Sequence, residues 1–575
     1  MLTLGINAAF HDSAAALVQD GRLIAAAEEE RFTHVKHGKR PVPFTTWELP
    51  YHAIDYCLRE AGVNLRDVDH VAYSYDPQRF IRERVRGDRI TLPMQPSAHG
   101  ADGWESVWDP LFASYIVNAP RQLAGGAPHH LKERFAGVRH DGPFRWHFVD
   151  HHVAHQASAC LASPFERCAV MTLDGRGEEA TTTYGRFRDG RYEPIGEVLM
   201  PHSLGLLYER ITSHLGFLHS SDEYKVMALA ALGRPTHLDT FRRLVSVGPE
   251  GRYRIEPFDP VALFGPARQR GGPLEQHHFD LTASLQAVLE ETVMQLARWL
   301  QRASGERQLA MAGGVALNCV MNAKLRDAGI FDEVWVQPAA GDAGTALGAA
   351  LHVDAAQRPG QPRVWTMEHA YWGPGYSDDE IEQLLRWAKL PYRRLHDVAE
   401  ETAEVLLQDK IIGWFQGRME FGPRALGARS ILASPLKPEM QQRLNELKDR
   451  EDFRPVAPVC PVDDLADWFT PAQANRGEAP FMLFIYDVKP EQAAKIPAVC
   501  HADLTARVQT VRRDTNPRYF DLLKAFGRRT GVPVLVNTSF NVRGEPIVCS
   551  PKDAINAFFS TPLDALVIGN FLIEK

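Results

Sequence analysis

The chain has 575 residues, 45% hydrophobic and 24% charged, a globular composition with enough length for two to four domains. Its 64 basic and 72 acidic residues leave a net charge of −8, which argues against nucleic acid as an obligatory partner. The start, MLTLGINAAF, lacks the basic segment of a signal peptide, and no uncharged apolar run approaches the roughly 18 residues of a membrane span. Seven scattered cysteines without a CxxC pair indicate reduced thiols, so we expect a cytoplasmic protein that binds no membrane.

Two segments of the first half, residues 2–28 and 170–197, share one layout: strand, polar turn, second strand, Asp-Gly turn, third strand. The Asp20-Gly21 and Asp189-Gly190 pairs are strong hairpin signals at matching places. We interpret the repeat as an internal duplication within an α/β fold. This layout resembles the actin and sugar-kinase architecture, in which two facing halves hold a nucleotide or substrate.

Histidines follow the strand predicted at residues 144–149, which ends at Asp150, a residue suited to cap a helix. On that helix His151 and His155 stand one turn apart on the same face, and a second strand at 168–173 leads into Asp174. Two imidazoles and a carboxylate suit a transition metal. An isolated histidine pair at this spacing is more often part of a core or a helix start, so the rest of the chain must decide.

Two glycine-rich turns occur further along the chain, each after a predicted strand. The strand at 309–314 ends in Gly313-Gly314 before a helix at 315–327, and the strand at 331–337 precedes a glycine-rich loop, 338–348, that enters a helix to residue 355. Backbone amides in such loops favour phosphate groups, which predicts a nucleotide site. The alternative is that the small residues allow close packing of helix on sheet.

Residues 355–372 are rich in Pro, Gln and polar residues and are predicted to be a linker. A second α/β unit begins at Gly373. Its predicted elements are helices at 377–388 and 398–408 and strands at 411–415, near 481–488 and at 533–536.

The second unit carries arginines placed among Gly, Pro and apolar residues rather than among acids. Arginine offers a planar fork of donors to phosphate or carboxylate oxygens, and lysine offers a point charge. A single arginine is usually a surface residue, but together the group predicts a pocket for a small, highly oxygenated anion. Its members are Arg418, Arg424, Arg429, Lys448, Arg454 and Arg507, with Asn537, Thr538, Ser539 and Asn541 expected just after the last predicted strand.

Seven blocks of sequence occur in a characteristic order along nearly the whole chain. They are FHDSAA at 10–15, AEEERF at 27–32, DHHVAH at 150–155, EYKVM at 223–227, GGVALN at 313–318, FGPRALGARS at 421–430 and LVNTSFNVRGEPIV at 535–548. With these blocks the chain resembles the O-carbamoyltransferases of antibiotic and nodulation-factor biosynthesis. The resemblance implies a domain at 1–365 similar to TsaD-type proteins and a domain at 366–575 similar to YrdC-type proteins, which form carbamoyl-adenylate.

The resemblance also implies roles for individual residues. The metal ligands would be His151, His155, Asp174 and Asp342, with iron(II) the usual metal, although this set would also accept manganese, zinc or cobalt. The catalytic residues would be His11, Lys448, Arg454 and Arg507. The nucleotide and carbamoyl phosphate would be held by Gly313, Gly314, Asn318, Gly341, Arg418, Arg424, Arg429, Asn537 and Ser539.

The implied reaction uses two sites. Carbamoyl phosphate loses its phosphate in the arginine pocket, and ATP, with Mg²⁺ as a candidate companion ion, traps the carbamate as carbamoyl-adenylate. The N-terminal cleft then transfers the carbamoyl group to a hydroxyl of a small-molecule acceptor, with His11 either taking the proton or only positioning the acceptor.

Three other functions stay open at this point: an actin-like kinase or phosphatase, a threonylcarbamoyl-type tRNA modifier, and a binding protein without catalysis. The acceptor and its modified hydroxyl are not readable, and contacts to it are expected in segments such as 74–131 and 203–221. Oligomeric state is open too, with a homodimer among the alternatives.

Overall fold

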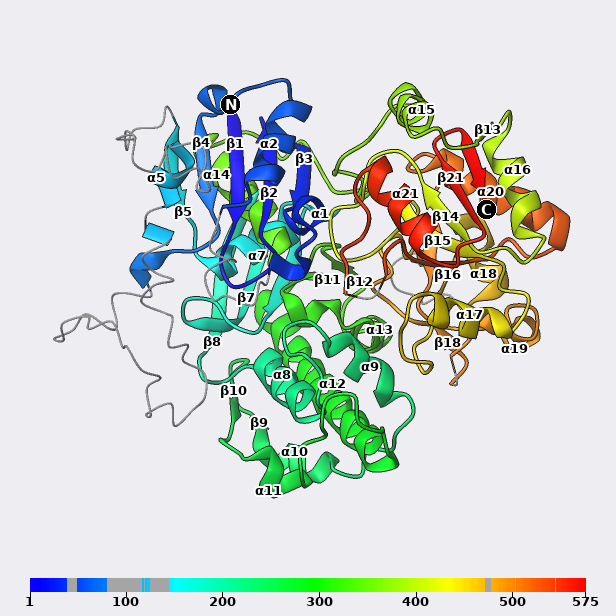
Figure 1. The fold of residues 1–575 in the computed structure, drawn as a ribbon. Helices are drawn as coiled ribbons and strands as arrows, with labels where there is room; N and C mark the ends of the chain where they lie inside the picture. Colours follow the sequence, from blue (N-terminus) through cyan, green and yellow to red (C-terminus); the bar gives the residue numbers. More distant parts are fainter. Residues whose placement is uncertain are drawn as a thin grey trace. The chain divides into compact units, whose positions relative to one another are not determined.

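The computed structural model describes residues 1–38, 49–79, 116–117, 119–124, 144–470, 477–501, 503–542 and 544–575, and these form two compact units (Figure 1). The first unit comprises Met1–Glu223, Gly233–Leu317 and Glu333–Met367. The second comprises Tyr224–Leu232, Asn318–Asp332 and Glu368–Lys575. The predicted division at 365/366 lies close to the last change of unit, between Met367 and Glu368. It does not include the two short segments, Tyr224–Leu232 and Asn318–Asp332, that come earlier in the chain and belong to the second unit. The predicted acceptor segment 74–131 lies largely outside the described residues.

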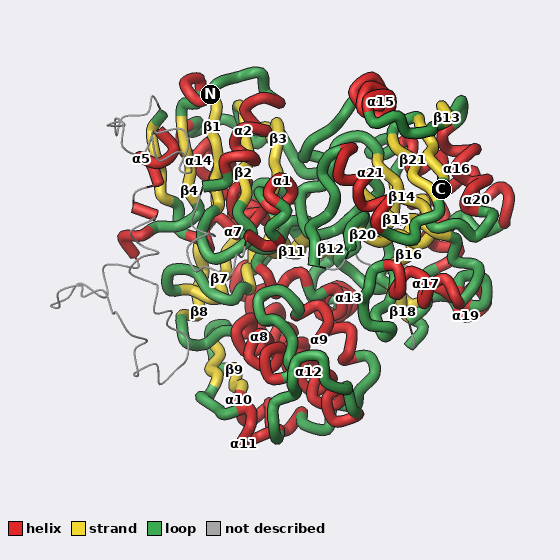
Figure 2. The backbone as a smooth tube through the Cα atoms, viewed as in Figure 1, coloured by secondary structure: helices red, strands yellow, loops and turns green. Residues whose placement is uncertain are grey.

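The first unit contains two five-stranded sheets with the same topology, and their strands are yellow in Figure 2. One has the order β3-β2-β1-β4-β5, and the other, read in the same direction, has the order β8-β7-β6-β11-β12. In each, three antiparallel strands are followed by two parallel ones. This repeat confirms the predicted α/β fold with an internal duplication. The strands are β1 Leu2–Asn7, β2 Ala14–Gln19, β3 Arg22–Glu28, β4 His70–Tyr73, β5 Arg145–Phe148, β6 Cys168–Leu173, β7 Ala180–Arg188, β8 Arg191–Leu199, β11 Gln308–Ala312 and β12 Glu333–Val336.

The two predicted hairpin turns have the expected backbone. Asp20 and Gly21 have φ values of 48° and 82°, and Asp189 and Gly190 have φ values of 52° and 73°. Positive φ at both central residues defines the tight turn that matches strand twist, and Asp-Gly tolerates it. These local signals explain why the strand triplets could be read from sequence.

Two buried helices, α7 (His151–Cys160) and α14 (Ala343–Gln357), pack on each other through their backbones. A Cβ on Gly348 of α14 would lie 1.8 Å from the carbonyl oxygen of Ala154 on α7. A Cβ on Gly5 of β1 would lie 1.9 Å from the carbonyl oxygen of Ala346. The predicted loop 338–348 is therefore wrong beyond residue 342, because its later glycines lie within a helix and allow close packing.

The described residues of the first unit include further helices. The longest, α12 (Gln276–Ser304), ends at Gly305, whose φ of 68° is typical of a helix C-cap. The rest are α1 Glu30–Thr33, α2 Tyr51–Glu60, α5 Ala119–Ala124, α8 Leu204–His214, α10 Leu238–Leu244 and α11 Pro260–Phe264, with a small hairpin of β9 Val245–Val247 and β10 Tyr253–Ile255.

The second unit is built on an eight-stranded mixed sheet of order β13-β22-β21-β14-β15-β20-β16-β19. Its strands are β13 Arg393–Arg394, β14 Ile412–Phe415, β15 Arg429–Ala433, β16 Ala457–Pro461, β19 Gln509–Val511, β20 Leu535–Ser539, β21 Ala565–Ile568 and β22 Phe571–Glu574, with a separate pair of β17 Tyr486–Asp487 and β18 Thr505–Ala506. Helices are α9 Glu223–Ala230, α13 Cys319–Asp327, α15 Asp378–Trp387, α16 Val398–Leu406, α17 Glu439–Leu447, α18 Leu465–Trp468, α19 Pro490–Ala493, α20 Pro517–Thr530 and α21 Pro551–Ser560.

Three further predicted elements differ from the structure. The helix predicted at 315–327 is interrupted, because Asn318 caps α13 by accepting a hydrogen bond from the Met321 amide at 3.0 Å. The strand predicted near 481–488 is only β17, and the last predicted strand is shifted to β20. The polar residues expected just after that strand therefore begin within it. No described helix is long and apolar enough to cross a membrane.

Candidate metal centre and anion site

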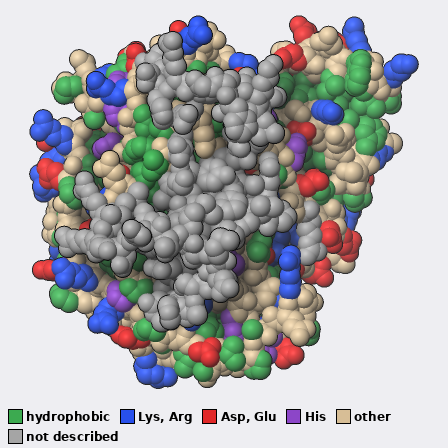
Figure 3. Space-filling model, turned by 60° about the vertical axis from the view of Figure 1, so that its left-hand side comes forward, with side chains coloured by type: hydrophobic (Ala, Val, Ile, Leu, Met, Phe, Trp, Pro, Cys, Tyr) green, Lys and Arg blue, Asp and Glu red, His purple; other side chains and the backbone are tan. Residues whose placement is uncertain are grey.

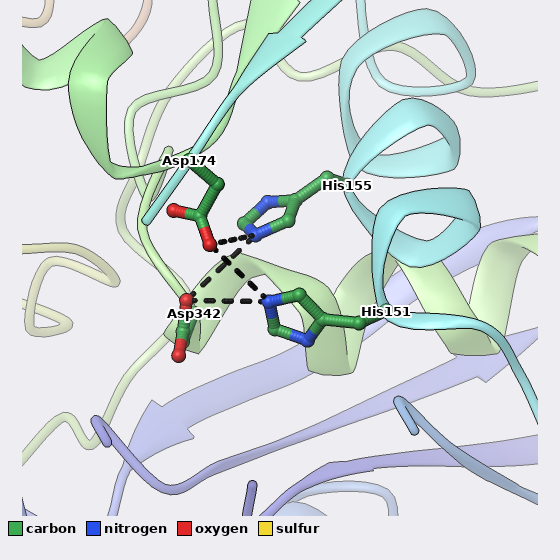
Figure 4. Close-up of side chains that lie close together, drawn as sticks. All are labelled: His151, His155, Asp174 and Asp342. Carbon is green, nitrogen blue, oxygen red and sulfur yellow. Dashed lines mark ion pairs between the residues drawn. The ribbon is translucent and has the colours of Figure 1, made fainter. Parts of the chain in front are cut away.

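Four side chains of the first unit converge at the predicted metal site (Figure 4). His151 and His155 lie on one face of α7, which begins at Asp150, whose side chain accepts a hydrogen bond from the Val153 amide at 3.0 Å. Asp174 directly follows β6, and Asp342 directly precedes α14. The two histidines thus come from one helix, and the two carboxylates come from the C-terminal end of a strand and the N-terminal end of another helix.

The distances within this set suit one metal ion. The Nε2 atom of His151 lies 3.6 Å from Asp174 Oδ2 and 3.5 Å from Asp342 Oδ1, and the corresponding distances for His155 are 3.9 and 3.7 Å. Ligands held tetrahedrally at about 2.1 Å from a metal lie about 3.4 Å apart. Both Nε2 atoms and Asp342 Oδ1 are buried without a hydrogen-bond partner among the described residues. The donor set therefore fits a divalent transition metal.

The charges in the set support one another. Burial alone would lower the pKa of His151, but Asp342 and Asp174 raise it well above its usual value. Burial would likewise raise the pKa of Asp342, but His11 and His151 lower it to about 2. The carboxylates therefore stabilise a buried positive charge, which is that of the protonated His151. A metal cation bound here would supply the positive charge in place of that proton.

Groups behind the ligands fix their orientation. The Gly314 amide donates to Asp174 Oδ1 at 2.7 Å, which leaves Oδ2 facing the histidines. The Nδ1 atom of His151 lies 3.3 Å from the Ser74 carbonyl oxygen, a contact that favours the tautomer with Nε2 as the metal-binding atom. The amide of Gly313 donates to Ala340 at 2.8 Å. Both glycine amides thus support this centre, and the predicted nucleotide contacts of Gly313, Gly314 and the neighbouring Gly341 stay predictions.

His11 stands beside the metal centre, on the turn that follows β1. Its Nε2 lies 3.7 Å from Asp342 Oδ2, and its Nδ1 lies 2.9 Å from Asp12 Oδ2. The Phe10 ring packs edge-on against the His151 ring at 5.1 Å between centroids. His11 is about a quarter exposed, so a ligand can reach it.

A second group of candidate ligands, Asp12, Glu30 and His37, lies nearby, and its members bond to one another. Asp12 Oδ1 lies 2.8 Å from His37 Nδ1, and Glu30 accepts a hydrogen bond from the His37 amide at 2.6 Å. Arg31 pairs with Glu30 at 2.8 Å. Its guanidinium would repel a cation, so we do not regard this group as a metal site.

In the second unit, four arginines gather with little opposing charge. Burial and the neighbouring Arg507 lower the pKa of Arg424 to about 9. Burial, with Arg454 and Arg507, lowers the pKa of Arg450 to about 9. The nearby carboxylate of Glu451 forms ion pairs with both Arg454, at 3.5 Å, and Lys225, at 3.2 Å, so it offsets only part of the positive charge. We call Arg424, Arg450, Arg454 and Arg507 the arginine cluster.

Donors of the arginine cluster are unsatisfied among the described residues. The Nε atoms of Arg424 and Arg507 and one terminal nitrogen of Arg450 are buried without a hydrogen-bond partner. A buried charged donor without an acceptor is destabilising by about 1–3 kcal/mol or more, so an anion at this place would satisfy a real deficit. Arg450 itself is held in place by Asn445, which accepts a hydrogen bond from its Nε at 2.5 Å.

Lys448 is part of a separate polar group. Its Nζ donates to Ser539 Oγ at 2.9 Å and to Asn541 Oδ1 at 2.8 Å, and it also bonds the Ser539 carbonyl. The side chain is only 6% exposed. Lysine, hydroxyl and amide therefore meet at the end of β20, where Ser539 lies, and their predicted contacts to carbamoyl phosphate and the nucleotide stay predictions.

Three other predicted residues make contacts that hold the fold. Arg429 is fully buried, and its guanidinium donates to main-chain carbonyls that include those of Gln416 at 3.0 Å and Pro374 at 2.8 Å. Arg418 donates to the carbonyls of Trp372 and Gly373. Asn537 donates to Ala425 at 3.1 Å and to Gln509 Oε1 at 2.7 Å, which fixes the loop that carries Arg424.

Sequence reasoning missed Arg450 and Gln509. Arg450 stands in the same KDRED segment as Lys448, and its position two residues further on was the available signal. Gln509 gives no local signal, because it acts through Asn537 and through the Leu426 carbonyl, which accepts from its amide at 2.7 Å. Asn318 caps α13 and is placed in the second unit.

The chain thus combines a duplicated α/β unit that carries a buried metal-type donor set with a second α/β unit that concentrates arginine. Models of the carbamoyltransferase N-terminus and C-terminus match residues 2–351 and 403–575. The chain therefore belongs to the carbamoyltransferase family and is a transferase, as its resemblance implied.

Relatives in bacteria match nearly the full chain. The nodulation protein NolNO of Sinorhizobium fredii is 40% identical over 99% of this chain and 80% of its own length. An uncharacterized protein of Synechocystis sp., sll1178, is 38% identical over 100% of this chain and 96% of its own length. Nodulation protein U of Rhizobium fredii is 30% identical over 93% of this chain and 89% of its own length.

Solved structures match only weakly. A ROK hexokinase from Thermus thermophilus is 17% identical, covers 62% of this chain and 99% of its own, and has a TM-score of 0.29. HypF of T. kodakarensis is 13% identical, covers 62% of this chain and 48% of its own, and has a TM-score of 0.32.

Proposed function

We propose that this carbamoyltransferase uses carbamoyl phosphate and ATP to make carbamoyl-adenylate and transfers the carbamoyl group to a hydroxyl of a small-molecule acceptor. The observation that carries the proposal is the arginine cluster with its buried, unsatisfied guanidinium donors. Since carbamoyl phosphate, ATP and pyrophosphate are all anions rich in oxygen, this cluster matches their charge and their acceptors.

Activation is assigned to the second unit. Water cleaves carbamoyl phosphate to phosphate and carbamate, and a carbamate oxygen then attacks the α-phosphorus of ATP as pyrophosphate leaves. The arginine cluster stabilises negative charge that develops on the phosphoryl oxygens, where one well-placed donor is worth about 3 kcal/mol. The group of Lys448, Ser539 and Asn541 offers further donors beside β20.

Transfer is assigned to the first unit. The acceptor hydroxyl attacks the carbamoyl carbon, AMP leaves, and His11 is placed to receive the hydroxyl proton at Nε2 or to hold the acceptor. His151, His155, Asp174 and Asp342 would hold the metal, which supplies Lewis acidity toward the carbamoyl or phosphoryl oxygens when bound. We expect iron(II), but the donor set would accept other divalent transition metals.

Nucleotide products test this proposal against a kinase or phosphatase. With ATP, carbon-labelled carbamoyl phosphate and a panel of polyhydroxylated natural products, we expect AMP, pyrophosphate and a labelled carbamate ester. ADP as the nucleotide product, with the carbon label confined to bicarbonate, would contradict the proposal.

A tRNA modifier is the second alternative, and its test is binding. On the face shown in Figure 3, basic and acidic side chains of the described residues are interspersed, as the net charge of −8 suggests. Nucleic-acid affinity depends on clustered positive charge and falls with salt. We expect no retardation of tRNA at low salt, and tight, salt-sensitive binding would favour the modifier.

A further inference from the structure

The EYKVM block lies on α9, and the segment Tyr224–Leu232 belongs to the second unit although its neighbours in sequence belong to the first. Two of its side chains meet the arginine cluster or its carboxylate. The guanidinium carbon of Arg454 lies over the Tyr224 ring, 4.8 Å from the ring centre. The Nζ atom of Lys225 lies 3.2 Å from Glu451 Oε1. A short segment from the first half of the chain therefore borders the predicted anion site.

Glu451 is the carboxylate that could neutralise Arg454. The two residues share a turn, in which the Arg454 amide donates to the Glu451 carbonyl at 3.1 Å. Their side chains lie 3.5 Å apart, between Arg454 Nη1 and Glu451 Oε2. A strong arginine–carboxylate hydrogen bond is about 2.7–2.9 Å long, so this contact is a weak one. A small movement of the Glu451 side chain would shorten it and take donors of Arg454 away from an anion.

Lys225 holds the other oxygen of the same carboxylate. Its side chain is only 12% exposed, compared with 27% for Glu451, and an ammonium group so far from water needs a counter-charge. Burial would raise the pKa of Glu451, but a hydrogen bond from its own amide, together with Lys225 and Arg454, lowers it, so the carboxylate is ionised at neutral pH. Lysine and arginine thus compete for one negative charge, and the shorter contact is that of the lysine.

The Arg454 guanidinium is held in a way that leaves its hydrogen bonds available to oxygen. Asn445 donates to the Arg454 carbonyl at 3.1 Å, which fixes the main chain. The Tyr224 ring attracts the cation, and this attraction does not supply an oxygen acceptor. The contacts of Arg454 therefore orient the group without a strong bond to a carboxylate.

We propose that Lys225 is a positioning residue of the anion site, which holds Glu451 away from Arg454 so that the Arg454 guanidinium keeps its donors for a phosphate group. Tyr224 supports this role by orienting the guanidinium. The inference rests on the proposed function in taking the arginine cluster as the place where phosphate-bearing substrates bind. It adds a lysine that acts through a carboxylate rather than through contact with the substrate.

Binding of inorganic phosphate to the full chain, measured by titration calorimetry without nucleotide, tests the proposal. Lys225→Met should weaken phosphate binding by about 10-fold, because Glu451 then closes on Arg454 and one charge-assisted hydrogen bond to the anion is lost. Lys225→Arg should stay within about threefold of the wild type, because arginine can hold the same carboxylate. Lys437→Met removes an exposed lysine that pairs with Asp409 in the same unit; as the matched control it should change the affinity by less than about twofold.

Coupling to Arg454 separates this role from a general effect of charge. In the wild type, Arg454→Met should weaken phosphate binding by about 10-fold, but in Lys225→Met it should weaken it by less than about threefold, because Arg454 is already paired with Glu451. Adding Glu451→Gln to Lys225→Met should restore both the affinity and the full effect of Arg454→Met. Additive losses would overturn the proposal, since a distant charge or a direct contact between Lys225 and phosphate would produce them.

Glu451→Gln alone decides the matter if Lys225→Met does not fold. This variant should bind phosphate at least as tightly as the wild type, and weaker binding would overturn the proposal, because Glu451 would then be needed to prepare Arg454 for the anion. A wild type that does not bind phosphate, or binds it without dependence on Arg454, would overturn the anion site of the proposed function together with this inference. Intact binding with additive effects of Lys225 and Arg454 would overturn the role of Lys225 alone.

Discussion

The metal centre in the first unit and the arginine cluster in the second are both buried groups of charge, but they are built on opposite principles. At the metal centre, carboxylates raise the pKa of His151 while histidines lower the pKa of Asp342. In the arginine cluster, like charges and burial lower the pKa of Arg424 and Arg450. One group combines charges of both signs, which offset one another, whereas the other concentrates charges of one sign.

Because of this difference, mutations in the two groups should change the free energy of unfolding in different ways. Removing a member of a compensated group leaves its partners buried and unpaired, which is destabilising. Removing a member of the repelling cluster relieves repulsion. The two groups should therefore respond to mutation with opposite signs in stability, although both lose function.

The largest effect is expected for His155→Ala. We predict loss of bound metal and a fall of about 10³-fold or more in carbamoyl product, because Lewis-acid stabilisation contributes several kcal/mol. Pyrophosphate release should be largely retained. Metal analysis and a product assay beside a pyrophosphate assay check this, with His277→Ala, an exposed histidine of α12, as the control. If product and pyrophosphate fell together, the division into two sites would be wrong.

Arg507→Met should raise the KM for carbamoyl phosphate by about 10- to 100-fold, since a charge-assisted hydrogen bond is worth about 1.5–3 kcal/mol. Steady-state kinetics of pyrophosphate release measure it. Arg450→Met, a residue that sequence analysis missed, should behave similarly. Arg443→Met, at an exposed arginine of the same unit, should leave KM unchanged. An unaltered KM in both cluster variants would remove the anion site from the cluster.

Arg424→Met should stabilise the protein by about 1 kcal/mol, because a buried cation beside Arg507 is replaced by an apolar chain. Denaturant unfolding without phosphate measures this. Asp342→Asn should instead destabilise the protein, since His151 would stay buried and lose one of its two counter-charges, with Asp174 left as the other. Loss of stability in Arg424→Met would show that the cluster is compensated after all.

The smallest effect concerns His501, whose pKa is lowered to about 4 by burial, with Arg507 adding to the shift. The folded state binds this proton less well than the unfolded state, so its contribution to stability is present above about pH 6.5 and is lost as pH falls toward 4. Arg507→Met should raise the His501 pKa by about half a unit, as measured by NMR titration. An unchanged His501 pKa in this variant would show that Arg507 does not contribute to the lowering.

Much of the fold was readable because its signals are local. Asp-Gly turns at 20–21 and 189–190 set both strand triplets, and Asp150 marked the start of α7. Asp342 could be paired with the histidines only through the family resemblance, because nothing local joins residues so far apart in the chain. The predicted loop at 338–348 failed because Gly344 and Gly348 allow close packing within a helix, which composition alone does not separate from a loop.

The arginines show the same limit. Arg424 and Arg429 stand in one sequence block, yet Arg424 has an unsatisfied donor while Arg429 binds main-chain carbonyls throughout its guanidinium. Both have the same composition around them, and only tertiary structure decides which guanidinium remains available to an anion. The contribution of Arg450 depends equally on Asn445 and on the fold that brings Arg507 near it.

The contact between Gly348 and Ala154 also bears on the spacing of the candidate metal ligands. Because a single methyl group at residue 348 would meet the Ala154 carbonyl at 1.8 Å, α14 and α7 are as close as two backbones can lie. Asp342 and His155 extend from these two helices, so the spacing of 3.7 Å between their ligand atoms is set by a residue that touches no metal. Gly348→Ala would push the helices apart and widen the spacing of these ligand atoms, so we expect the affinity for a small transition-metal ion to fall.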